Sequence, residues 1–219
     1  MLTVDSYDAV STQVMLSPTA PTDLTGLERI ILAAQGDLQR ILSAFFSRPI
    51  FVERIDANTS PRLRPVSPQY PITQARKVHL KCASRVVCIA TSTITITSPE
   101  YERVFLDEKL PIGQTFRRLN SHPKFDLLDV GAREICGRRE LHRTYRLETE
   151  GFAADILEVF PDRNMFIQCE DWLTSDTISK DVCRFPLMQL QRKSRLRISM
   201  DNAAKGICCL LLLYVLVTH

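Results

Sequence analysis

The sequence predicts an α+β protein in which an antiparallel sheet is flanked by helices. Apolar residues recur at helical spacing between residues 27 and 46, ahead of any strand-like segment. Further along, polar and apolar residues alternate in four segments, at 74–81, 85–96, 138–147 and 153–160. The connections at 82–84 and 148–151 are too short for parallel pairing, so the members of each pair are expected to run antiparallel.

The first part of the chain predicts an arm followed by two helices. Residues 1–24 are rich in Ser, Thr, Pro and Asp and lack a period, which is typical of a loosely held arm. A short amphipathic helix is expected before the break at Gly36, and a second from Asp37, its candidate N-cap, to Phe46. Leu38 lies on the apolar face of the second helix, which we expect to enter the core.

The middle of the chain predicts two more strands and a long connection. Residues 50–55 are rich in β-branched residues and precede a proline-rich loop at 56–71, whose length is unusual for a compact domain. Short helices are expected after Ser98 and at 115–120, and a strand at 125–131.

The stretch Lys109-Leu110-Pro111-Ile112-Gly113 predicts a corner. Pro111 restricts its own φ and Gly113 permits a positive φ, so the pair can turn the chain. The N–H groups of Ile112 and Gly113 would then suit an anion. A plain turn is the other interpretation, and both are open.

Two charged residues fall on the apolar side of predicted strands. Arg76 shares a face with Val78, and Glu158 shares one with Ile156. Arg76 is interpreted either as an edge arginine whose head reaches water or as a binding group for a ligand carboxylate. A carboxylate buried like Glu158 requires a cation or a proton.

The composition is that of an ordinary globular chain. Of 219 residues, 45% are hydrophobic and 24% charged, so one domain with a sizeable core is expected, as a monomer. A formal net charge of +3, with acids and bases interspersed, argues against nucleic acid as a partner and is compatible with a small anionic ligand.

The cysteines and the N-terminus favour a cytoplasmic protein. The seven cysteines form an odd set without a CxxC pair or a Cys/His cluster at metal-ligand spacing, so we expect reduced thiols and no metal site. The first residues lack the apolar core of a secretory signal and the arginines of a transit peptide.

Four segments together resemble, in order and spacing, the landmarks of the chorismate pyruvate-lyase family, whose members include 4-hydroxybenzoate synthases. They are Arg76-Lys77-Val78-His79-Leu80, Lys109-Leu110-Pro111-Ile112-Gly113, Gly137-Arg138-Arg139 and Ile156-Leu157-Glu158-Val159-Phe160. The resemblance covers residues 27–166 and implies the chorismate lyase-like fold. It also implies a carbon–oxygen lyase that converts chorismate to 4-hydroxybenzoate and pyruvate without a cofactor or a metal. The expected division is an arm at 1–24, a domain at 25–166 and an extension at 167–219.

The same resemblance implies the residues of the site. Arg76 and Glu158 match the family's ligand-binding arginine and glutamate and are the expected catalytic pair; Leu38, Ile112 and Gly113 are expected as further substrate-binding residues. We expect Arg76 and Glu158 on neighbouring antiparallel strands, with both side chains in one pocket floored by Leu38 and Ile112. A guanidinium suits one of the two carboxylates of chorismate, and a carboxyl group can exchange a proton with the ring or its hydroxyl.

The sequence departs from the family at a second arginine, which would align near Thr91. That contact is missing or supplied elsewhere, with Arg85 and Arg143 as candidates. A second function is therefore kept open, namely a non-catalytic domain of the same fold that binds a small aromatic acid and leaves it unchanged.

Residues 167–219 lie outside the resemblance. They contain a basic run at 191–197 and an apolar run at 207–217, which is shorter than the roughly 20 residues of a membrane-spanning helix. A tail that associates with a membrane surface, a buried terminal strand and a non-native end are open interpretations. No stable membrane span is expected.

Overall fold

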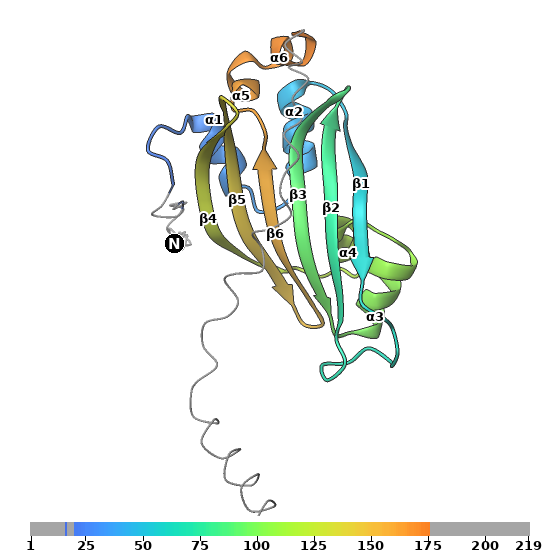
Figure 1. Ribbon diagram of the computed structural model, residues 1–219. Helices are drawn as coiled ribbons and strands as arrows, with labels where there is room; N and C mark the ends of the chain where they lie inside the picture. The colour runs from blue at the N-terminus through green and yellow to red at the C-terminus, as the bar shows by residue number, and fades with distance from the viewer. Residues whose placement is uncertain (1–15, 17–19, 176–219) are drawn as a thin grey trace, which may run out of the picture. The chain divides into compact units, whose positions relative to one another are not determined.

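The computed structural model of the protein describes residue 16 and residues 20–175 (Figure 1). Most of the predicted arm at 1–24 lies outside the described residues, as do the basic run at 191–197 and the apolar run at 207–217. Among the residues that are described, no helix is long and apolar enough to cross a membrane.

A six-stranded antiparallel sheet forms the centre of the α+β fold, as the alternating segments predict. Its strands are β1 (Ile50–Thr59), β2 (Ile72–Cys82), β3 (Arg85–Ile96), β4 (Lys124–Ile135), β5 (Arg138–Thr149) and β6 (Phe152–Phe160). The spatial order is β1-β2-β3-β6-β5-β4, so the pairing of β3 with β6 joins two three-stranded meanders. β1 continues beyond the predicted end at residue 55, because it stays paired with β2 as far as Gln74.

The helices lie toward the two ends of the sheet (Figure 1). At one end are α1 (Gly26–Ala33), α2 (Leu38–Phe46), α5 (Asn164–Gln168) and α6 (Glu170–Thr174). Toward the other end are α3 (Pro99–Tyr101), the π-helix η1 (Glu102–Asp107) and α4 (Ile112–Arg118).

The starts of α1 and α2 differ in how they are capped. Thr25 begins α1 with a capping box: its hydroxyl accepts from the Glu28 N–H at 3.3 Å, and the Glu28 carboxylate accepts from the Thr25 N–H at 2.7 Å. Asp37 precedes α2 as predicted, but its side chain makes no capping bond, because its backbone is left-handed with φ of 52° instead of extended. Its carboxylate pairs with Arg117 of α4 instead.

The corner at 109–113 also differs from the prediction. Gly113 lies in the first turn of α4 and has no positive φ, whereas Lys109 is left-handed with φ of 57°. The chain therefore turns at Lys109, and Pro111 occupies the N-cap position of α4.

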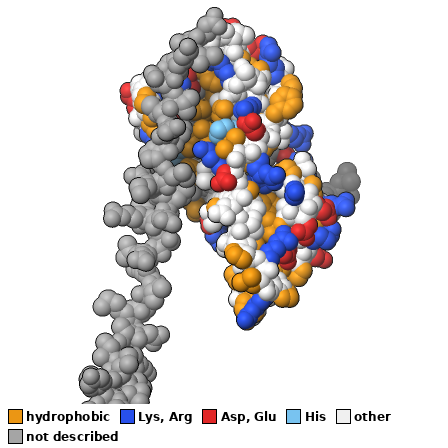
Figure 2. Space-filling model, turned by 45° about the vertical axis from the view of Figure 1, so that its right-hand side comes forward, with side chains coloured by type: hydrophobic (Ala, Val, Ile, Leu, Met, Phe, Trp, Pro, Cys, Tyr) orange, Lys and Arg blue, Asp and Glu red, His pale blue; other side chains and the backbone are white. Residues whose placement is uncertain are grey.

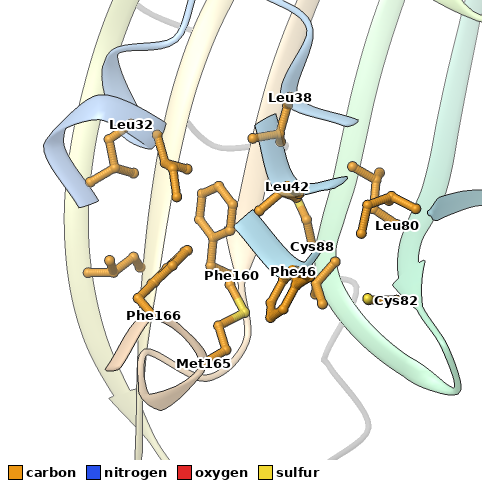
Figure 3. Packing of buried hydrophobic residues seen from close by; sticks show 14 of the residues in the cluster. Leu32, Leu38, Leu42, Phe46, Leu80, Cys82, Cys88, Phe160, Met165 and Phe166 are labelled. Carbon is orange, nitrogen blue, oxygen red and sulfur yellow. The ribbon is translucent and has the colours of Figure 1, made fainter. Parts of the chain in front are cut away.

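Two clusters of buried apolar residues cover one face of the sheet. The first cluster lies beneath α1, α2 and α5 and includes Leu38, Leu42, Phe46, Phe160 and Met165 (Figure 3). The second cluster lies beneath α3, η1 and α4 and includes Tyr101, Phe105, Phe116 and Phe152. The apolar face of α2 thus enters the core through Leu38, as expected from the sequence.

The first cluster extends past residue 166, where the sequence-based domain was expected to end. Trp172 of α6 is buried in it, and the indole N–H donates to Asp162 at 2.8 Å. The guanidinium of Arg85 lies 4.7 Å from the Trp172 ring centroid. The first residues of the expected extension therefore contribute to the core of the domain.

The cysteines differ in burial. Cys82 and Cys88 are buried free thiols and Cys169 is an exposed one. Cys136 lies at the turn between β4 and β5.

Candidate functional site

A band of eight residues, five of them polar, lies where the two apolar clusters meet on the covered face of the sheet. Strand pairing aligns its members in two neighbouring rows, because directly paired residues point to the same face. The first row, from β2 to β5, is Arg76, Ser92, Ile156 and Tyr145. The second is Val78, Ala90, Glu158 and Arg143. Arg76 and Glu158 therefore share this face.

Arg76 and Glu158 are not on neighbouring strands, so that expectation is wrong. β3 lies between β2 and β6 and pairs with both. With two strand spacings and one row between them, their Cα atoms are about 12 Å apart. A ligand that touches both side chains must bridge this distance between the rows.

Glu158 is held by two donors from β5. Arg143 Nε donates to Glu158 Oε2 at 2.6 Å, and the Tyr145 hydroxyl donates to Oε1 at 2.9 Å. Arg143 is completely buried, and Glu158 and Tyr145 are each 6% exposed. Charge-assisted hydrogen bonds in such surroundings are strong, and removal of one partner leaves an uncompensated buried group.

Arg143 also links the C-terminal end of α1 to the sheet through hydrogen bonds. Its Nη1 donates to the carbonyl oxygens of Ile31, Leu32 and Ala34 at 3.0, 3.1 and 2.7 Å. These carbonyls belong to the last turn of the helix and its C-cap, where a cation is favourable; the Ile31 carbonyl also accepts from the Ala34 N–H at 3.3 Å. The Arg143 guanidinium lies 4.9 Å from the Tyr145 ring centroid, and its buried Nη2 has no hydrogen-bond partner among the described residues.

The surroundings of this cluster disfavour additional negative charge. Burial, with the negative charge of Glu158, raises the pKa of the Tyr145 hydroxyl well above its usual range. The same two causes raise the pKa of the buried Cys88 thiol. Tyr145 therefore acts as a neutral donor, and Cys88 stays a thiol.

Arg76 lies at an open cavity of about 440 Å³ on the β1 side of the sheet. Its lining comes from β1, β2 and the segment around η1: Arg54, Ile55, Asp56, Ala57, Thr59, Arg62, Gln74, Arg76, Phe105, Leu106 and Lys109. The Arg76 guanidinium lies 5.7 Å from the Phe105 ring centroid, and its buried Nε has no hydrogen-bond partner among the described residues. Burial, and to a smaller extent the charge of Arg54, lowers the pKa of Arg76.

The other expected substrate-binding residues lie around the band, and none of them lines this cavity. Leu38 belongs to the first apolar cluster, Ile112 packs against the second, and Gly113 is exposed. Glu158 is not part of the cavity lining either. The structure thus brings Glu158 together with Arg143 and Tyr145, and places Arg76 in the adjoining row.

The two candidates for the missing second arginine differ in position. Thr91 pairs with Lys77 and Leu157 and so points to the opposite face of the sheet from Arg76. Arg85 stacks on Trp172 and donates to the carbonyl of Ser175, away from the band. Both face the covered side of the sheet, since Arg85 pairs with Cys82, but of the two only Arg143 lies in the row beside Arg76.

The sequence did not single out Tyr145, Arg54 or Lys109 as site residues. Tyr145 was on the same predicted strand face as Arg143, and that alternation was the available signal. Arg54 lies beside a β-bulge in the pairing of β1 with β2, and Lys109 has a left-handed backbone. Neither feature is marked by a characteristic residue type in this sequence, so neither position could be predicted as part of the cavity.

Comparison with known proteins adds no assignment. No protein-family model and no curated protein matches this chain. Within the described part of the chain, no three His, Cys, Asp or Glu side chains are grouped as metal ligands.

Proposed function

We propose that this protein is a chorismate lyase-like enzyme, with the chorismate lyase-like fold, that eliminates pyruvate from chorismate to give 4-hydroxybenzoate. One observation carries the proposal. A partly buried arginine without a protein partner for its Nε opens into a cavity on the same sheet face as a buried glutamate. Such an arginine suits a ligand carboxylate, and the glutamate supplies an acid–base group.

The elimination needs a proton acceptor and a proton donor but no oxidant. The proton on C4 of the chorismate ring leaves, the bond between C3 and the ether oxygen breaks, and the ring becomes aromatic. The departing enolpyruvate takes up a proton at its methylene carbon and becomes pyruvate. Atoms and electrons balance, since the two products together contain the atoms of chorismate.

The residues of the band can divide these tasks. Arg76 binds a carboxylate and orients the ring, and Glu158 accepts the ring proton. Arg143 and Tyr145 position Glu158 through the hydrogen bonds described above. Leu38 and Ile112, from the clusters on either side, exclude water from the ring.

A second candidate function is a non-catalytic domain that binds an aromatic acid. The observation in its favour is that Glu158 already accepts hydrogen bonds from two protein groups, as a purely structural carboxylate would. In that case Arg76 would bind the ligand carboxylate and no chemistry would follow.

Incubation of the purified protein with chorismate tests the proposal. We expect 4-hydroxybenzoate and pyruvate in equal amounts, and a Glu158→Gln variant that stays folded but loses about 10² to 10⁴ in rate, the usual contribution of a general acid–base group. An Arg118→Gln variant, which changes an exposed residue of α4 outside the cavity, is the control. Binding of 4-hydroxybenzoate without turnover of chorismate would favour the second function, and full turnover by a folded Glu158→Gln protein would remove Glu158 from the mechanism.

A further inference from the structure

The cavity at Arg76 carries an excess of positive charge. Arg54 of β1, Arg76 of β2 and Lys109 of the turn before α4 all line it, and within the described residues none of the three has an ion-pair partner. Arg62 differs, because it pairs with Asp107 at 2.7 Å and with Glu102 at 3.4 Å. Asp56 is the acidic residue of the lining.

This lack of partners contrasts with the surrounding surface. Figure 2 turns the β1 side of the molecule forward and shows basic side chains beside acidic ones on it. Elsewhere near this edge, Lys81 pairs with Glu53 at 2.6 Å, and Arg103 pairs with Glu108. At the cavity, three cations without such partners lie together, although other basic residues of the described chain, such as Arg118 and Arg138, also lack an ion pair.

Local backbone features bring these cations together. The pairing of β1 with β2 shifts between Arg54 and Asp56, and a bulge of this kind re-aims the neighbouring side chains. Arg54 pairs with Val78, on the same face of β2 as Arg76. Lys109 has a left-handed backbone, which is uncommon for a residue other than glycine and often accompanies a functional position.

Like charges that converge on one cavity repel each other until an anion occupies it. We propose that Arg54 and Lys109 form a second carboxylate subsite beside Arg76, so that the cavity selects small ligands with two carboxylates, one on Arg76 and one at the mouth. This inference rests on the proposed function, since chorismate belongs to that ligand class. In this interpretation, Arg54 of β1 and Lys109 of the turn before α4 supply the positive charge that the family's second arginine would provide near Thr91.

Calorimetric titration with two matched probes tests the subsite. 3-(Carboxymethoxy)benzoate has two carboxylates, and 3-methoxybenzoate lacks the second. We expect the wild-type protein to bind the dicarboxylate about tenfold more tightly or better at low salt, and this preference to shrink as salt screens the exposed charges. In the double variant Arg54→Gln/Lys109→Gln the preference should fall to roughly twofold, because the second carboxylate loses its partners.

Two further variants test whether the dicarboxylate preference comes from the mouth of the cavity. Arg118→Gln, an exposed change outside the cavity, should keep the wild-type preference. Arg76→Gln should weaken both probes by a similar factor, because both retain the ring carboxylate. Arg54 and Lys109 are exposed, so their replacement should leave the fold intact, which a thermal melt checks.

Equal binding of the two probes by the wild-type protein would overturn the inference, and so would a preference that survives in the double variant. Turnover of chorismate is measured separately. Absence of products together with an intact dicarboxylate preference would overturn only the proposed function. Formation of products together with equal probe binding would overturn only the second subsite.

Discussion

The buried pair of Arg143 and Glu158 allows a quantitative test of how the candidate site is built. In Arg143→Met and Glu158→Leu, each charged residue is replaced by an apolar one of similar size. The double variant removes both charges together. A double-mutant cycle of the three proteins and the wild type then gives the coupling energy between the two side chains.

The contacts set the expected magnitudes. Arg143→Met leaves Glu158 buried with only the Tyr145 hydroxyl and frees the carbonyl oxygens at the end of α1. Loss of one partner from a buried ion pair costs roughly 3–5 kcal/mol in the free energy of unfolding. Glu158→Leu should cost a similar amount, because it leaves the Arg143 charge buried. The double variant buries no unpaired charge, so it should be more stable than either single variant, with a coupling energy above about 2 kcal/mol.

Urea unfolding followed by tryptophan fluorescence provides the assay, since Trp172 is buried in the first cluster. Arg118→Met, at an exposed position, should change the free energy of unfolding by less than about 0.5 kcal/mol and serves as the control. A double variant whose destabilisation equals the sum of the two single ones would refute the coupling. It would show that Arg143 acts mainly through the carbonyls of α1.

Three further predictions concern metals, the end of the domain and pH. The proposed turnover of chorismate should survive chelation by EDTA, because the described His, Cys, Asp and Glu side chains are not grouped as metal ligands; loss that added metal restores would contradict this. A chain ended at Phe166 should unfold more easily than one ended at Ser175, by roughly 3–5 kcal/mol, because it lacks the buried Trp172; equal urea midpoints would oppose this. Burial raises the pKa of Glu28, but hydrogen bonds from Arg163 and Thr25 outweigh it, so the pKa lies below its usual value. Its stabilising contribution should therefore be complete above the ordinary pKa and be lost as pH falls through the lowered one, a loss that Glu28→Gln should not show in acid titrations of stability.

Much of the local structure could be predicted from the sequence, because it depends on short-range patterns. Alternation of period two identified the strand pairs of β2 with β3 and of β5 with β6, and it placed Arg76 and Glu158 on apolar faces. The helical period of α2 identified Leu38 as a core residue. Each of these predictions needs only residues close together in the chain.

The relations between distant segments were decided by the tertiary structure. Periodicity does not show which strand lies beside which, so the insertion of β3 between Arg76 and Glu158 was not predictable from it. The partner of Glu158 is Arg143, because the register of β5 against β6 aligns the two residues and buries both. Alternation could show that Arg143 and Glu158 each face inward. That the two form an ion pair depends on the long-range pairing of β5 with β6.

The cavity shows the same division. That Arg76 faces the covered side of the sheet follows from its neighbours in the chain. Arg54 and Lys109 lie near Arg76 in the same cavity because of a bulge in β1 and a left-handed residue before α4. These two features bring together residues that are far apart in the sequence. The chain sequence thus determined which side chains point inward, while long-range strand pairing and these two backbone irregularities decided which of them meet, because contacts between distant residues depend on the packing of the whole domain.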